Sequence, residues 1–167
     1  MTIAPDTRTI VLVHRPHRGG DSCDPAIDLD APGISALLTE YQRTRSQAAL
    51  DALPLRPGKE PARFKIRRVS QGELRYILSD DSFVGQAHRA VACGCHEFTD
   101  ASGREHKARV VSESGGAFAD PAWLDEIGDE YGGAALMEIG HAVIQWAQAP
   151  RSALAPFASA PGLVLSR

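Results

Sequence analysis

The chain is poor in aromatic residues and in cysteine. Of its 167 residues, 6% are aromatic and three are cysteines, an odd number that does not make a disulfide framework and that suits a reducing compartment. No apolar run approaches the roughly eighteen residues of a membrane span, since the best candidate, residues 134–149, is interrupted by Glu138 and His141. The early Asp6 and the short apolar run at residues 10–13 predict that there is no signal peptide. We therefore expect no membrane partner.

The chain also lacks a large excess of positive or negative charge. The net charge is −3, which gives no global electrostatic reason to expect nucleic acid as a partner. The glycine pair at residues 19–20 lacks the lysine and the spacing of a phosphate-binding loop. Asp24, Asp28 and Asp30 lack the central glycine and the closing glutamate of a calcium loop. The sequence therefore predicts no bound cofactor.

The length and the residue patterns predict one domain with extended ends. We expect an α+β fold, namely a mostly helical single domain with a small antiparallel sheet or hairpin and extended N- and C-terminal arms. Residues 1–33 form an arm, a short strand and a long loop, residues 34–149 form the core domain, and residues 150–167 form the C-terminal arm. Proline-rich residues 51–62 and glycine-rich residues 112–119 are predicted loops.

Short β-rich runs predict the strands. Residues 9–13 (TIVLV) are apolar and β-branched, which favours a buried strand. Residues 63–67 place Phe64 and Ile66 on one side and basic residues on the other, which is typical of a half-exposed strand. The run ACGCHEF (92–98), the turn at residues 100–103 and the run KARVVS (107–112) indicate a β-hairpin or an irregular excursion between helices.

Capping residues predict where helices begin. Residues 33–50 carry an apolar stripe at helical spacing. Ser70 and Glu73 form a capping box, Asp80, Asp81 and Ser82 can cap a second helix, and Asp120 before a proline begins the helical residues 121–149. The apolar stripe of this last region is predicted to be its buried face: Leu136, Ile139, Val143 and Trp146.

The cysteines and histidines are the only concentration of soft metal ligands. In a strand, Cys93 and Cys95 point one way and His96 the other; in a helix, Cys93 and His96 share a face and Cys95 leaves it. A zinc site needs four converging ligands, so His106, or His88 or Cys23, would have to complete it. The simpler interpretation is that the cysteines pack as small apolar residues. A cysteine nucleophile would need a base held against it, and no signature around His96 supplies one.

Two further patterns in the sequence have both a functional and a simpler structural interpretation. Glu138 and His141 share a helix face, as in di-iron bundles, but the second copy that such a site requires is absent from the sequence. The basic strand face can meet a phosphate backbone or an acidic partner, or be a strand edge that charge keeps from aggregating. Its residues are Arg63, Lys65 and Arg67.

The C-terminal segment combines prolines with scattered apolar residues. Pro150, Pro156 and Pro161 exclude a continuous helix. We expect an extended arm that lays its apolar side chains into grooves of its own domain or of a neighbouring subunit, with Phe157 as the chief anchor. The other predicted contacts of the arm are Leu154, Leu163 and Leu165. A frayed terminus is the alternative.

Residues 61–149 resemble a family of small accessory proteins. The strand EPARFKIRRVS, the turn HEFTDASGRE and the helical PAWLDEIGDEYGGAALMEIGHAVIQWA follow an order similar to that of accessory and structural proteins of tailed bacteriophages, including tail-assembly chaperones. The resemblance implies a non-enzymatic structural or interaction protein, located in the virion and bound in many copies to other phage structural proteins. It also implies that the Cys93–Cys95 position is a plain apolar strand or turn.

Two alternatives stay open. The N-terminal third departs from the chaperone pattern, so a minor virion component is the first hypothesis and a tail-assembly chaperone is the second. The third is a zinc-binding module or metal-dependent enzyme centred on Cys93, Cys95 and His96.

Overall fold

The computed structural model describes residues 6–13, 24–113 and 116–149, and these ranges form six helices and six strands. The strands are β1 (Thr7–Ile10), β2 (Arg63–Arg67), β3 (Cys95–Thr99), β4 (Glu105–Lys107), β5 (Val110–Glu113) and β6 (Gly116–Ala119). The helices are α1 (Ile34–Thr44), α2 (Gln47–Asp51), α3 (Gln71–Leu78), α4 (Phe83–Gly94), α5 (Pro121–Tyr131) and α6 (Gly133–Gln148). The predicted α+β class is confirmed. No helix within the described ranges has the length and apolarity needed to cross a bilayer.

The four-stranded sheet is antiparallel throughout, in the order β1-β2-β3-β4. Phe64 of β2 pairs with Ile10 of β1 and with Phe98 of β3, and the two phenylalanine rings stack with their centroids 5.2 Å apart. Strand β2 therefore has a neighbour on both sides, and its interpretation as a charge-protected edge is wrong. The edges of this sheet are β1 and β4.

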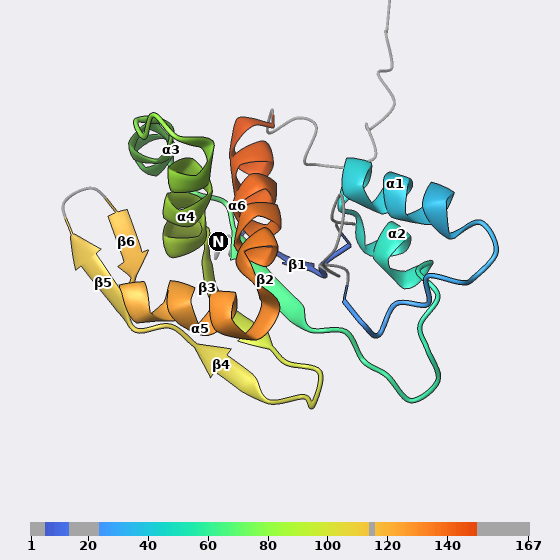
Figure 1. Cartoon of the computed structure of the whole chain (residues 1–167). Coiled ribbons are helices and arrows are strands. Elements are labelled where there is room, and N and C mark those ends of the chain that lie inside the picture. The colour runs from blue at the N-terminus through green and yellow to red at the C-terminus, as the bar shows by residue number, and fades with distance from the viewer. Residues whose placement is uncertain (1–5, 14–23, 114–115, 150–167) are drawn as a thin grey trace, which may run out of the picture.

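Helices α4 and α6 pack closely against each other over one face of the sheet (Figure 1). Small residues permit this approach: a Cβ at Gly140 would lie 2.4 Å from the carbonyl oxygen of Ala87, and one at Gly94 would lie 2.5 Å from a methyl group of Val143. The predicted stripe of α6 is buried in this core, as expected: Leu136, Ile139, Val143 and Trp146.

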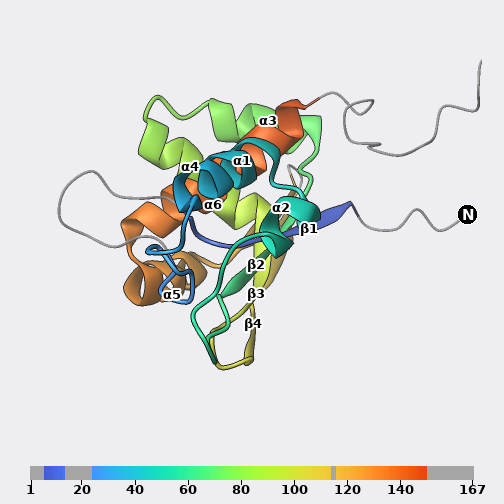
Figure 2. The ribbon, with the colours of Figure 1, turned by 90° about the vertical axis from the view of Figure 1, so that its right-hand side faces the viewer.

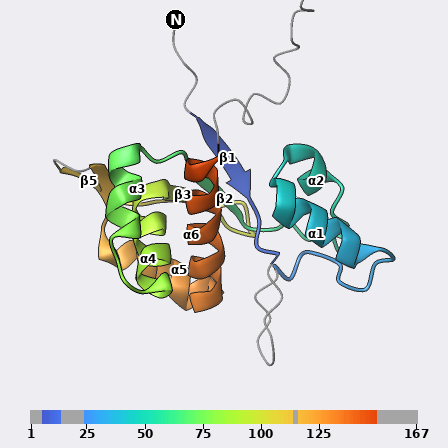
Figure 3. The same ribbon diagram turned by 90° about the horizontal axis from the view of Figure 1, so that it is seen from above.

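A second, smaller apolar cluster joins α1 and α2 to the extended residues 10–13. Ile10 and Leu12 belong to the main core, whereas Val11 and Val13 belong to the second cluster with Tyr41. This alternation places the run between two apolar layers. From above, α3 to α6 lie on one side of β1 and the α1–α2 pair lies on the other (Figure 3). Figure 2 views the chain from the α1–α2 side, with the sheet and α6 behind them.

Polar side chains satisfy the backbone of residues 11 and 13, which form no strand ladder. The amide N–H of Val11 donates to the hydroxyl of Tyr41 at 2.9 Å, and that of Val13 donates to the carboxylate of Glu138 at 2.9 Å. The predicted strand at residues 9–13 is correct in being buried, but the ladder ends at Ile10 because side chains replace strand partners beyond it.

Local signals account for most of the remaining elements. Ser70 and Glu73 form the predicted capping box of α3, Ser82 caps α4 and Asp120 caps α5. The turn at residues 100–103 connects β3 to β4, as a hairpin predicts. The predicted loop at 112–119 is wrong in part, because residues 116–119 form β6 and pair with β5.

Candidate functional site

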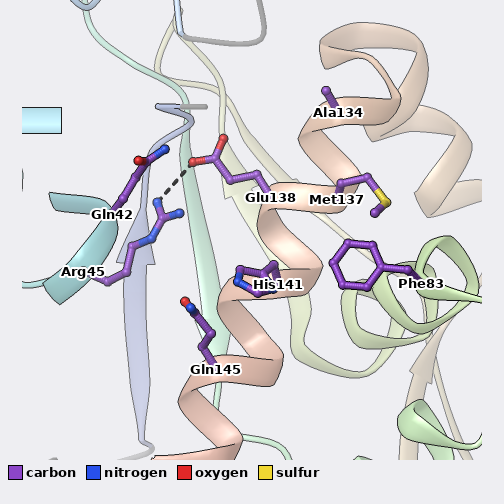
Figure 4. Close-up of a pocket in the computed structure, with 8 residues that line it drawn as sticks. All are labelled: Gln42, Arg45, Phe83, Ala134, Met137, Glu138, His141 and Gln145. Atoms are coloured by element: carbon purple, nitrogen blue, oxygen red, sulfur yellow. Dashed lines mark hydrogen bonds and ion pairs between the residues drawn. The ribbon is translucent and has the colours of Figure 1, made fainter. Parts of the chain in front are cut away.

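A groove runs along α6 on the side that faces α1 (Figure 4). Its volume is about 520 Å³. The α6 side chains recur every three or four residues, so they share one face of the helix. The walls are Gln42 and Arg45 at the end of α1, Phe83 at the start of α4, and Ala134, Met137, Glu138, His141 and Gln145 on α6.

A buried ion pair connects the two sides of the groove. Arg45 Nη1 lies 3.2 Å from Glu138 Oε1, and the two side chains are only 11% and 4% exposed. The same carboxylate accepts the amide hydrogen of Val13. Burying a carboxylate is unfavourable unless it is paired and hydrogen-bonded, and Glu138 meets both conditions. It therefore connects α6 to the end of α1 and to the segment that follows β1.

The backbone of Arg45 is held in an uncommon conformation. Its φ of 48° lies in the left-handed region, which costs a non-glycine residue about 1–2 kcal/mol. Its N–H donates to the carbonyl oxygen of Tyr41 at 2.7 Å, and its guanidinium lies 5.1 Å from the centre of the Tyr41 ring. This cap ends α1 and turns the arginine side chain toward α6, where Glu138 receives it.

The rim of the groove carries exposed apolar side chains. Phe83 is 61% exposed although it is a large aromatic residue, and the adjacent Val84 is also exposed. Ser82 accepts the N–H of Gly85 at 2.9 Å, so this cap fixes Phe83 in the first turn of α4. Its ring centroid lies 6.2 Å from that of His141, and Figure 4 shows it beside Met137. Exposed aromatic residues at a concave surface are typical of sites that bind a partner.

A second hollow of about 470 Å³ adjoins the first and shares Arg45 and Gln145 with it. Its walls are more basic, with Arg8 from β1 and Arg43 from α1, and Trp146 of α6 also lines it. The guanidinium of Arg8 lies 4.4 Å from the centre of the Trp146 ring, which is a cation–π contact. Burial lowers the pKa of Arg8, an effect that Asp6 opposes and Arg68 reinforces.

The cysteines lie in the main apolar core. Cys93 lies in the last turn of α4 and Cys95 begins β3, and both side chains are fully buried. Burial raises the pKa of each thiol to about 12, and Glu73 adds to the effect at Cys93. Thiolates, which zinc binding and nucleophilic attack both require, are therefore disfavoured at these positions.

The two candidate histidines have separate partners. The ring Nε2 of His96 lies 2.7 Å from the carbonyl oxygen of Ala92, and burial lowers the pKa of this histidine. His106 lies between two carboxylates, with Nε2 2.9 Å from Asp100 and Nδ1 2.8 Å from Glu126. Its ring stacks on Phe98 at 4.4 Å, and the hydrogen bond to Asp100 raises its pKa.

The candidate metal ligands do not form one cluster in the described part of the chain. No three histidine, cysteine, aspartate or glutamate side chains are grouped there in a way that could hold a metal ion. Cys23, a possible additional ligand, lies outside the described residues.

The basic residues of β2 each face a glutamate. Arg67 lies 2.6 Å from the buried Glu73, and Lys65 lies 3.6 Å from Glu97 on β3. Arg63 lies 4.0 Å from Glu60. These contacts offset the charge of the strand face, and its partner-binding role stays a prediction.

The predicted arm contacts lie outside the described residues: Leu154, Phe157, Leu163 and Leu165. Of the groove residues, Glu138 and His141 were noted in the sequence only as an incomplete di-iron pattern, and the others were missed. Glu138 carried a detectable signal, because a glutamate in phase with Ala135, Ile139 and Ala142 predicts a carboxylate on the buried face of a helix. Arg45 and Phe83 carried none. Comparison of the chain with protein-family models, with curated proteins and with solved structures gives no match.

Proposed function

We propose that this chain is a non-enzymatic interaction protein of a tailed-phage particle, where it binds neighbouring structural subunits. The observation that carries the proposal is the groove along α6 with the 61%-exposed Phe83 at its rim. A large exposed aromatic residue beside a preformed hollow provides the kind of anchor on which protein interfaces concentrate their binding energy. Many copies of the chain in a symmetric virion would each present this groove to a neighbour.

The surroundings of the chemically active side chains support a structural role. The two buried thiols have raised pKa values, and His96 is bound to a backbone carbonyl group. His106 is engaged on both ring nitrogens by carboxylates. A nucleophile or general base needs a free reactive atom within reach of a substrate, and these contacts occupy such atoms with structural partners.

The phage assignment comes from the resemblance of residues 61–149 to accessory proteins of tailed phages. It is tested by purifying particles from the phage that encodes the chain and identifying their proteins by mass spectrometry. We expect the chain at a fixed ratio to the other structural proteins. A chain that is abundant in the lysate but absent from finished particles would refute the virion role and favour the assembly chaperone.

A matched pair of variants tests whether incorporation of the chain into particles depends on the groove. Phe83→Ser removes the rim anchor, and Val111→Ser removes a 45%-exposed apolar side chain on β5, away from the groove. Both positions are exposed, so we expect both variants to fold. Incorporation into particles should fall at least five-fold for Phe83→Ser and stay within two-fold of the native chain for Val111→Ser. Equal incorporation of the two variants would exclude the groove as the contact.

Deletion of residues 151–167 tests the arm. Both apolar clusters lie within residues 10–147, so we expect the shortened chain to fold. We also expect it to be lost from particles, because the arm supplies the anchor Phe157. Normal incorporation would defeat the arm hypothesis, and loss of folding would place the segment in the domain's own core.

A further inference from the structure

The two hollows beside α6 form one continuous groove with two different ends. They meet at Arg45 and Gln145, which line both. The end near Ala134 has apolar side chains, with Met137 and the exposed Phe83. The end near Ala149 is basic. A ligand that lies along α6 would therefore meet apolar contacts first and positive charge next.

The basic end has more positive charge than its neighbours neutralise. Arg43 pairs with Glu40 at 2.8 Å, and Arg45 pairs with Glu138. In the described part of the chain, neither Arg8 nor Arg68 forms an ion pair, although Asp6 is close enough to influence the pKa of Arg8. One role of Arg68 is internal, because its Nη2 donates to the carbonyl oxygen of Ala149 at 2.6 Å and so caps the end of α6.

Three hydrogen-bond donors without acceptors belong to residues that line the basic hollow or contact its wall at Ala149. Among the described residues, the buried polar side-chain atoms that lack a partner are Arg45 Nε, Arg68 Nη1 and Trp146 Nε1. Trp146 is 4% exposed and lines the basic hollow, and Arg8 stacks on its ring. Buried donors are normally paired, so these three have unused hydrogen-bonding capacity beside the basic hollow.

We propose that this groove binds an acidic amphipathic segment of a partner protein. A large apolar side chain of the segment packs between Phe83 and Met137, and its carboxylates lie against Arg8 and the neighbouring arginines. Residues 134–149 of α6 span about 22 Å at 1.5 Å per residue, which an extended segment of about seven residues covers. The proposal rests on the proposed interaction function and names the chemistry of the partner.

The observations favour a peptide over a nucleic acid. The chain has a net charge of −3, and the basic hollow is local rather than part of a long positive surface. The adjoining apolar half of the groove matches hydrocarbon or aromatic side chains and contains no second cluster of arginines for the next phosphates. A short acidic segment with one apolar anchor matches both halves.

The proposal is tested by selecting a library of random twelve-residue peptides on the immobilised full chain. We expect the enriched peptides to carry Phe, Leu, Met or Trp within about seven residues of two or more Asp or Glu residues. Fluorescence anisotropy then measures their binding to groove variants Arg8→Glu and Met137→Glu and to control variants Lys59→Glu and Leu78→Glu. Lys59 and Leu78 are exposed outside the groove. Each groove variant should weaken binding at least ten-fold, and each control by less than two-fold.

A spectroscopic readout on the native chain keeps the test independent of variant folding. The chain has two tryptophans, so its ¹H–¹⁵N spectrum contains two indole signals. Trp123 donates to the carbonyl oxygen of Cys95 in the core, whereas Trp146 lies at the groove. A selected peptide should shift the Trp146 signal, assigned with Trp146→Phe, and leave the Trp123 signal in place.

Several results would overturn the proposal. These are enrichment of basic or neutral peptides, no enrichment at all, an unshifted Trp146 signal, or equal losses in groove and control variants. Tight binding of a labelled single-stranded oligonucleotide that Arg8→Glu abolishes would assign the basic end to nucleic acid instead. A chain that is found in particles but selects no acidic peptide would refute this inference alone, whereas its absence from particles would refute the proposed function alone.

Discussion

Replacement of Glu138 by leucine should remove a polar contact that joins the two apolar clusters, and it should therefore destabilise the folded chain. The carboxylate accepts from the guanidinium of Arg45 at 3.2 Å and from the N–H of Val13 at 2.9 Å, and both donors come from distant parts of the chain. Leucine fills a similar volume but accepts neither. An unsatisfied buried N–H costs about 1–3 kcal/mol, and a lost hydrogen bond to a charged group costs about 1.5–3 kcal/mol. We therefore expect the free energy of unfolding to fall by about 3–5 kcal/mol, the range known for a broken buried ion pair.

The double variant Glu138→Leu/Arg45→Leu separates the charge from the backbone contribution. It removes the unpaired guanidinium and leaves the N–H of Val13 without its acceptor. The cost should then return to about 1–3 kcal/mol relative to the native chain. Urea unfolding followed by far-ultraviolet circular dichroism measures both variants, with the slope of the transition checked for constancy. Removal of a second side chain would thus restore stability.

Two results would refute this reasoning. A Glu138→Leu variant within about 0.5 kcal/mol of the native chain would behave like a surface substitution and would mean that the carboxylate is hydrated. A double variant as unstable as the single one would assign the cost to packing rather than to charge. Hydrogen exchange supplies a local check, because the Val13 amide should lose protection, while the Val11 amide keeps its bond to Tyr41.

Four other changes have expected outcomes. Replacement of Cys93 and Cys95 by alanine should cost about 1–2 kcal/mol at each site in chemical unfolding, and stoichiometric zinc that is lost in this variant would contradict the apolar interpretation. Trp146→Ala should cost about 3–5 kcal/mol in the same assay, since the side chain is 4% exposed, and a change within experimental error would mean that the stripe is not buried. Trp146→Phe should cost less than about 1.5 kcal/mol, because the indole N–H has no acceptor to lose. His106 has a raised pKa in the folded chain, so its contribution is complete below the unfolded pKa of about 6.5 and is lost as the pH rises through the folded value. His106→Gln should therefore be destabilising at pH 6 and close to the native chain at pH 9, and a pH-independent difference would exclude this ionic contribution.

Elements that depend on neighbouring residues in the sequence could be predicted. Ser70 and Glu73 satisfy each other's backbone donors across one turn, so the start of α3 is decided within four residues. Ser82 before α4 and Asp120 before α5 act in the same local way. The stripe that includes Leu136 was also correct, because helical spacing determines which residues share a face.

Elements that depend on distant pairing could not be predicted. Strand β6 (Gly116–Ala119) belongs to residues 112–119, whose serines and glycines are typical of a loop, and it is a strand because β5 supplies the ladder. The alternation of apolar and basic residues in β2 correctly predicted which side of the strand is buried. Its position inside the sheet depends on β1, which lies more than fifty residues earlier. No local pattern reports how many neighbours a strand has.

The groove belongs to this second kind of feature. Glu138 is 93 residues from Arg45 and 125 residues from Val13, so only the tertiary structure brings the three together. Helical spacing puts Glu138 in phase with the buried Ala135, Ile139 and Ala142, and a carboxylate on a buried face needs a partner. The sequence did not identify the partner, because many arginines have the same local surroundings as Arg45.

The groove lies between the two clusters, so we expect substitutions in its walls and substitutions at its rim to affect stability and binding differently. One wall comes from α1 and the other from α6, and Arg45 and Glu138 connect the two walls by a polar contact rather than by apolar packing. A substitution at Glu138 should therefore change both the free energy of unfolding and the affinity for a ligand, because it releases one wall from the other. Met137 and Phe83 touch the hollow without making this connection, so substitutions there should change affinity at nearly constant stability. If the rim variants lost as much stability as the Glu138 variants, the rim itself would be holding the clusters together, and the groove would be a structural seam rather than a binding surface.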